Sequence, residues 1–97
     1  MVKMVIEKAT AKNKKWKAIF YDDQGKKIKT VQFGSGGMSD FTIHKDKERK
    51  QRYLDRHKKR ENWNDPMTAG ALSRWILWNK PTLDGSIKDF KKRFKLK

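Results

Sequence analysis

Cationic side chains at a helical spacing are the residues of this chain best suited to chemistry with a polyanion. At 100° per residue they share roughly 80° of arc on one helix face. Arginine presents a planar fork of donors that pairs bidentately with phosphate or carboxylate, whereas lysine acts as a point charge. The spacing therefore predicts a surface that contacts a phosphate backbone or an acidic protein. The set is Lys45, Arg49, Arg52, Arg56 and Arg60.

Two alternatives explain the same spacing without a partner. The face can be solvated and partly neutralised by i, i+4 pairs such as Glu48 with Arg52. Some arginine stems can also be buried beside Tyr53 and Leu54.

A second basic set lies near the end of the chain. Residues 83–94 place Leu83, Ile87, Phe90 and Phe94 at i, i+4, i+7 and i+11, which indicates an amphipathic helix. Its polar side is either a non-specific phosphate contact or an ordinary solvated surface. The lysines of that side are Lys88, Lys91, Lys92 and Lys95.

The four tryptophans offer a possible base-stacking role, which requires exposed rings among cations. Trp75 and Trp78 have the spacing of core residues. Trp16 lies in an expected strand between Lys15 and Lys17. Trp16 is therefore the candidate for contact with a nucleic acid or another partner.

Catalytic and metal-binding patterns are weak. His44 and His57 stand 13 residues apart without any cysteine, and a zinc site needs three or four ligands. No Gly-x-Ser-x-Gly elbow or paired-carboxylate arrangement is present. We expect a protein that is not an enzyme and that uses no metal, cofactor or small-molecule substrate.

The first third of the chain has strand-like alternation. Residues 2–9, 14–21 and 26–33 are the expected strands, and the turn at residues 22–25 ends in Gly25. An antiparallel β-hairpin or a three-stranded meander accounts for residues 1–33. A Gly-rich connection at residues 34–40 then leads to a helical part at residues 41–97.

Three helices are expected in the second part, which makes the fold α+β. The first runs from about residue 46 to 61. The second runs from residue 66 to 78, with Asp65 as its N-cap and Pro66 at its first position. This second helix is apolar almost all round, so it should be the buried centre of the fold. Thr82 should cap the last helix.

Length and charge bound the class of protein. Ninety-seven residues form one domain, and the formal net charge is +15. Residues 1–40 and 41–64 each hold nine basic residues against four acidic ones, and residues 65–97 hold eight against three. The charge is thus spread over the whole domain and concentrates anions near it. No apolar run approaches the ~20 residues of a membrane span, so no membrane insertion is expected.

The helical part contains a series of short motifs: FTIHKDKERK (41–50), RENW (60–63), TAG (68–70), SRW (73–75), LWNKPTL (77–83) and SI (86–87). Together they resemble a family of small basic, uncharacterised proteins encoded by nucleocytoplasmic large DNA viruses of the phycodnavirus, mimivirus and related groups. The resemblance covers about residues 33–94, and the strands fit it more loosely.

The resemblance implies a setting and no catalytic residues. It implies a virion protein that is present in the host cytoplasm or nucleus during assembly. Two functions remain open at this point. One is non-specific binding of nucleic acid, most simply duplex DNA, in genome packaging or architecture. The other is that of a minor capsid protein that binds between acidic capsid-protein surfaces.

Overall fold

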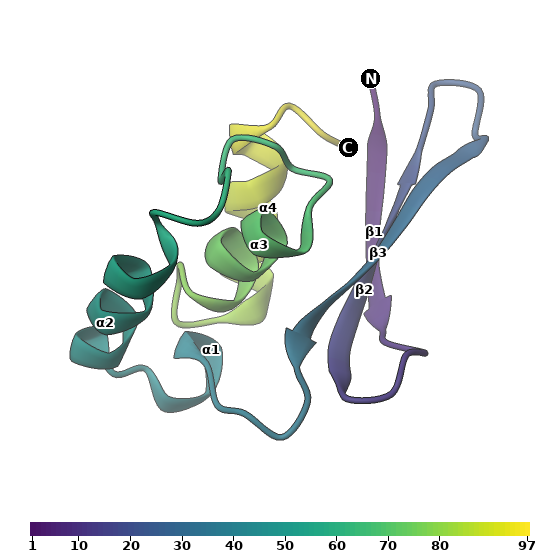
Figure 1. Cartoon of the computed structure of the whole chain (residues 1–97). Helices are drawn as coiled ribbons and strands as arrows, with labels where there is room; N and C mark the ends of the chain where they lie inside the picture. The colour runs from purple at the N-terminus through teal and green to yellow at the C-terminus, as the bar shows by residue number, and fades with distance from the viewer.

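The chain begins with a three-stranded antiparallel sheet in the order β1-β2-β3, as Figure 1 shows. The computed structural model describes all residues from 1 to 97. β1 spans Lys3–Lys8, β2 spans Lys14–Tyr21 and β3 spans Lys27–Ser35. The α+β class is confirmed, and the meander is the correct one of the two expected strand arrangements.

The turn between β2 and β3 is built by one acidic side chain and one glycine. Asp22 Oδ1 accepts hydrogen bonds from the backbone N–H groups of Gln24 and Lys26, both at 2.9 Å. Gly25 has φ +82°, a conformation that side-chain-bearing residues rarely adopt. These interactions fix the register of β2 on β3, so that alternate residues of β2 face the helices.

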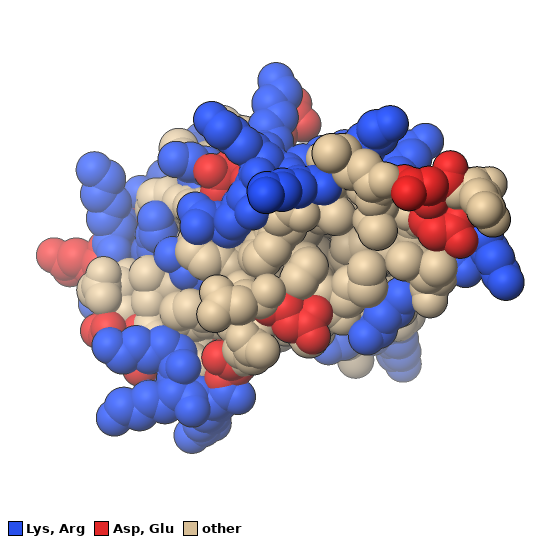
Figure 2. Space-filling model, turned by 90° about the horizontal axis from the view of Figure 1, so that it is seen from above, with Lys and Arg blue, Asp and Glu red and all other residues tan.

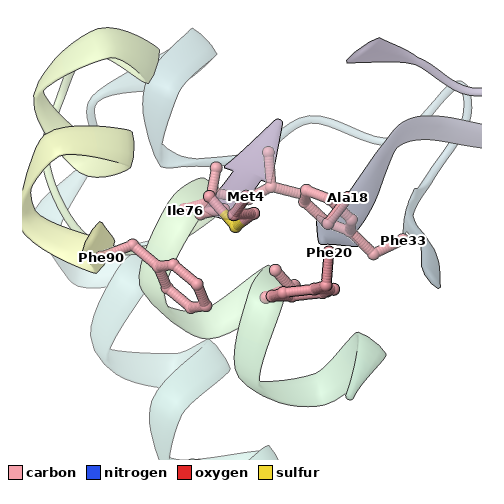
Figure 3. Close-up of a cluster of buried hydrophobic side chains, with 8 residues drawn as sticks. Met4, Ala18, Phe20, Phe33, Ile76 and Phe90 are labelled. Carbon is pink, nitrogen blue, oxygen red and sulfur yellow. The ribbon is translucent and has the colours of Figure 1, made fainter. Parts of the chain in front are cut away.

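The core lies between one face of the sheet and the helices. Met4, Ala18, Phe20 and Phe33 come from the strands, and Figure 3 shows them meeting Ile76 and Phe90 from the helices. Each of these side chains is at least 99 % buried. A domain of this size has a thin core, so these few side chains supply much of its stability.

α3, its continuation and α4 cover that face, whereas α1 and α2 lie beside them and contribute no residue to the core cluster. α1 spans Phe41–His44, α2 spans Lys47–His57, α3 spans Ala69–Leu72 and α4 spans Leu83–Arg93. α3 continues without a break into a π-helical turn, Ser73–Leu77, in which the Trp78 N–H donates to the Ser73 carbonyl at 3.1 Å. This continuous helix is the buried one, as expected, through Ala71, Leu72, Ile76 and Leu77.

Two expected helix boundaries are wrong. The helix of residues 46–61 ends at His57, because the residues after Leu54 supply no apolar side chain that would hold another turn on the core. The buried helix begins at Ala69 and not at Pro66. Thr68 caps it, with Oγ1 accepting from the Ala71 N–H at 3.2 Å, while Asp65 instead closes a turn by accepting from the Met67 N–H.

Caps and chain ends close the fold. Thr82 caps α4 as expected, accepting from the Gly85 N–H at 3.1 Å. Lys97 pairs with β1 through the Met4 N–H and the Val2 carbonyl, at 2.9 and 3.0 Å, so the chain ends against its first strand. None of the helices combines the length and the apolar character that crossing a membrane requires.

Candidate nucleic-acid interface

Three of the predicted arginines project from α2 without carboxylate partners. Asp46 caps the helix by accepting from the Glu48 and Arg49 N–H groups, at 3.0 and 3.3 Å. Arg49, Arg52 and Arg56 are exposed, and none forms an ion pair with Asp or Glu within 4.0 Å. The neutralising pair between Glu48 and Arg52, one of the sequence-based alternatives, is therefore absent. The burial alternative also does not apply to these three side chains.

The three arginines line one surface hollow, which we call the arginine hollow. Its other walls are Met38 and Ser39, from the Gly-rich connection, and Trp78, from the end of the π-helical turn. Exposed arginines without carboxylate partners around one concave surface are a suitable arrangement for the oxygens of a phosphate or carboxylate.

α2 is held on the domain by a small number of contacts. Tyr53 is its single buried residue and stacks on Trp78, with ring centroids 4.3 Å apart and planes 5° apart. Lys50 Nζ donates to the Asn79 carbonyl at 2.8 Å and lies 4.9 Å from the Phe41 ring centroid. The rest of the helix is therefore free to present its cations to solvent.

The other two members of the predicted set flank the helix. Lys45 lies in the left-handed region with φ 57°, and its N–H closes α1 on the Phe41 carbonyl. Arg60 lies in the turn after α2, with its N–H donating to the His57 carbonyl at 3.0 Å. Both are exposed, but neither lines the arginine hollow.

A second hollow, here called the central hollow, lies between α2 and the end of the sheet where β2 begins and β3 ends. It shares Met38, Ser39, Arg56 and Trp78 with the arginine hollow. Both of its carboxylates are already paired within the protein. Its basic and acidic residues, with its histidine, are Lys14, Lys15, Asp40, Arg56, His57 and Glu61.

The two carboxylates of the central hollow are bound within the protein. Asp40 is 2 % exposed, contacts Lys15 Nζ at 2.5 Å, and caps α1 by accepting from the Thr42 N–H at 2.9 Å. Glu61 pairs with His57 Nδ1 at 3.2 Å and accepts from the Trp63 Nε1–H at 3.3 Å. Lys14 and Arg56 have no such partner. An incoming anion therefore meets unpaired cations in this hollow.

Trp16 lies in a third hollow, the Trp16 hollow, with Lys8, Lys14, Lys15 and Ile43. The indole is half-buried and also packs against the core. The hollow shares Lys14, Lys15 and Asp40 with the central hollow. The structure thus connects Trp16 with the α2 arginines, which lie more than 30 residues away in sequence.

The predicted C-terminal lysines belong to a different part of the surface. Lys88, Lys91 and Lys92 lie on α4, and Lys95 follows it with φ 54°. The arginine, central and Trp16 hollows include no residue of α4. Figure 2 shows Lys and Arg side chains around most of the rim of one face, with mainly uncharged surface and some Asp and Glu side chains between them. The structure therefore does not gather the two basic sets into one site.

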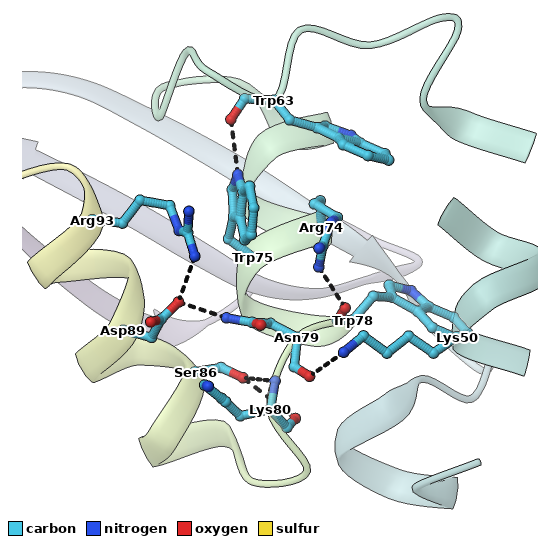
Figure 4. Close-up of polar contacts among 10 residues, drawn as sticks. All are labelled: Lys50, Trp63, Arg74, Trp75, Trp78, Asn79, Lys80, Ser86, Asp89 and Arg93. Carbon is cyan, nitrogen blue, oxygen red and sulfur yellow. Dashed lines mark hydrogen bonds and ion pairs between the residues drawn. The ribbon is translucent and has the colours of Figure 1, made fainter. Parts of the chain in front are cut away.

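Sequence reasoning missed a stack of alternating aromatic and cationic side chains beside α4, drawn in Figure 4. The Arg74 guanidinium lies 5.4 Å from the Trp63 ring and 4.1 Å from the Trp75 ring, and Arg93 lies 3.8 Å from the Trp75 ring. Trp75 is half-buried in this stack and packs against the margin of the core. Arg74 and Trp75 are adjacent in the sequence, but only the folded chain brings Trp63 and Arg93 to them.

The same region holds cations at the C-terminal end of the buried helix. Arg74 Nη1 donates to the Trp78 carbonyl at 2.8 Å, and its Nε is buried without a partner. Burial of the guanidinium group, and to a lesser extent the positive charge of nearby Arg93, lowers the pKa of Arg74. Burial of the ammonium group, and to a lesser extent the positive charge of Arg74, lowers the pKa of Lys50. Both side chains donate hydrogen bonds to backbone carbonyls just after the C-terminal end of the buried helix, where the helix dipole is negative. Their role is therefore structural.

The histidines serve packing in this fold. His57 stacks on Tyr53 with centroids 4.2 Å apart, and His44 lies 5.3 Å from the Trp78 ring. His44 Nδ1 accepts from the Asp46 N–H at 2.8 Å. The structure contains no group of three or more His, Asp or Glu residues placed to hold a metal ion.

Comparison with known proteins adds a family without an assigned function. No curated protein and no solved structure matches this chain. Residues 4–57 match the model of a family of unknown function (DUF5754), and this match covers the sheet, α1 and α2, including Trp16 and the α2 arginines. The match extends over more than half of the 97 residues, so the chain belongs to this family.

Proposed function

We propose that this protein is a non-enzymatic nucleic-acid-binding domain whose α2 arginines contact phosphates without sequence specificity. The observation that carries the proposal is the arginine hollow, which Arg49, Arg52 and Arg56 line without a carboxylate partner. Phosphate contacts by Arg and Lys supply most of the free energy of non-specific nucleic-acid binding. Phosphate contacts position a protein on nucleic acid without reading its sequence, so specificity is not part of the proposal.

The net charge of +15 supports the same function at longer range. A field of this size attracts a polyanion from any direction, and the lysines of α4 add to it without forming a defined site. The arginine hollow then provides the short-range contacts. The resemblance to small basic proteins of large DNA viruses suggests genome packaging in a virion as the setting, and this setting is part of the proposal.

The decisive measurement is the salt dependence of duplex binding. For B-DNA the logarithm of the binding constant falls with the logarithm of salt concentration by ~0.9 for each phosphate contact. Arg52→Gln together with Arg56→Gln should lower this slope by about 2, and by the same amount on unrelated sequences. Charge-conserving Arg52→Lys with Arg56→Lys should retain most of the slope but bind less tightly, because lysine lacks the bidentate fork.

A matched control removes two charges elsewhere. Lys26 and Lys27 lie at the β2–β3 turn, are exposed, and line none of the three hollows. Changing both to Gln lowers the net charge by the same amount as the arginine double variant, so it measures the general effect of the field. Equal slopes for the two double variants, both folded, would contradict a role for the arginine hollow in binding nucleic acid.

The minor-capsid alternative predicts a different result from the same variants. Duplex affinity would be weak near physiological salt and insensitive to the position of the lost charges. Binding to an acidic capsid protein would instead decline in the arginine double variant. No feature of the structure favours this alternative over nucleic acid.

A further inference from the structure

The Trp16 hollow combines an accessible indole with lysines. Its volume is about 420 Å³, within the ~300–1,000 Å³ of small-ligand sites. Ile43 is 62 % exposed at its rim. The Trp16 N–H donates to no group of the protein, and it is not among the buried unpaired polar groups, so it opens to solvent. In contrast, the N–H groups of Trp63 and Trp75 donate to Glu61 and to the Trp63 carbonyl.

The Trp16 hollow is linked to the proposed phosphate site through shared wall residues. Lys14 and Lys15 belong to both the Trp16 and the central hollows, and Arg56 belongs to both the central and the arginine hollows. Six Lys or Arg side chains line the three hollows against two carboxylates, and both carboxylates are paired within the protein. A flexible polyanion can therefore follow one cationic path from α2 to Trp16.

We propose that this path binds a single-stranded segment of nucleic acid, with one unpaired base stacked on Trp16 and adjacent phosphates on Lys8 and Lys14. The inference rests on the proposed function and specifies its substrate. An aromatic ring within a cationic groove is the usual arrangement of single-strand sites, because every base has a face that can stack. Bases of a duplex are stacked within the helix and cannot enter the hollow, so duplex binding would use the arginine hollow alone.

The first test uses the unaltered protein. Indole N–H signals are followed by ¹H–¹⁵N NMR during addition of an oligothymidylate of about eight nucleotides, within the ~4–16 nucleotides that such grooves cover. We expect the Trp16 signal to move with the oligothymidylate and to stay in place with a blunt duplex. The Trp63 and Trp75 signals, whose hydrogen bonds are internal, should remain in place with both.

The second test compares affinities. Trp16→Leu retains an apolar side chain against the core and should lower the affinity for oligothymidylate about tenfold, the lower half of the range for loss of one stacked base. Duplex affinity should stay within about twofold. Trp63→Leu is the matched control, because Trp63 is also half-buried but lines none of the hollows. If Trp16→Leu does not fold, the NMR titration of the unaltered protein decides.

The outcomes separate this inference from the proposed function. If the amides of α2 shift with oligothymidylate while the Trp16 indole does not, the stacking site is wrong and phosphate binding at α2 stands. If neither the α2 amides nor the Trp16 indole shifts near physiological salt, the stacking site and the proposed nucleic-acid binding at α2 are both wrong. If an oligoglutamate peptide moves the Trp16 signal as much as oligothymidylate does, the hollow binds acidic peptide without preference for bases, and the single-strand inference is overturned.

Discussion

Tyr53 offers a way to test how α2 is positioned without changing any charge. Its ring is sandwiched between Trp78 and His57, at centroid distances of 4.3 and 4.2 Å. It is the single buried side chain of α2. We therefore expect Tyr53→Ala to loosen this helix specifically, while the sheet and the Phe20 and Phe33 core remain folded.

The magnitude follows from the burial of the ring. Truncation of a buried aromatic side chain costs ~3–5 kcal/mol. Tyr53 is 8 % exposed and lies at the margin of the core, so we expect about 3 kcal/mol, the lower end of this range. That is a large share of the ~5–15 kcal/mol that stabilises a domain. Because the other contacts of α2 are few, much of the loss should be expressed as local opening.

Hydrogen exchange is the appropriate assay, with urea unfolding beside it. Amides of α2 should lose protection in Tyr53→Ala, while those of β2 retain a larger part of theirs. Duplex affinity should also fall, although the three arginines and the net charge are unchanged. Tyr53→Phe is the control: the hydroxyl forms no hydrogen bond within the protein, so its removal breaks none and stability should change by less than ~0.5 kcal/mol. Wild-type protection of α2 in Tyr53→Ala would refute this account of how the arginines are held.

Three further predictions concern the whole domain. Ile76→Ala should cost ~2–5 kcal/mol in urea unfolding because Ile76 is fully buried, whereas Lys92→Ala should match wild type; equal midpoints would contradict the assigned core. Burial and the nearby Arg74 hold the pKa of Lys50 below 10.5, so the unfolded chain retains that proton longer as pH rises. Wild type should therefore gain stability relative to Lys50→Gln as pH rises towards 10.5, and parallel pH profiles would exclude this linkage. Chelator treatment should leave the melting temperature unchanged, since no cluster of ligand side chains exists, and a fall of several degrees would reveal a metal.

Local patterns in the sequence were sufficient to predict most of the fold. The alternation of Trp16, Ala18 and Phe20 and the turn at Gly25 predicted the strands, because side-chain direction in a strand repeats every two residues. The apolar character of residues 66–78 identified the buried helix, and Thr82 identified the start of the last one. The predicted start of the buried helix was wrong because Asp65 and Thr68 are both suitable N-cap residues, and only the packing of the folded chain selects between them.

The residues of the candidate site could be predicted from the sequence, but their arrangement on the surface could not. The i, i+3 and i+7 spacing of Arg49, Arg52 and Arg56 follows from helix periodicity and could be read without a structure. Whether those arginines find carboxylate partners depends on tertiary contacts, since Glu48 stands four residues from Arg52 yet does not pair with it. The C-terminal lysines were equally plausible by sequence, and the fold places them outside the hollows.

The connection between Trp16 and α2 was decided by the tertiary structure alone. Residues 36–40 connect β3 to α1 so that the start of β2 lies beside α1 and near α2, and the Asp40–Lys15 contact fixes this junction. The π-helical turn brings Trp78 to Tyr53, while Trp75 lies between two arginines. Periodicity describes only neighbours along one element, whereas a site made from β2, the Gly-rich connection and α2 requires long-range contacts whose geometry no local pattern contains.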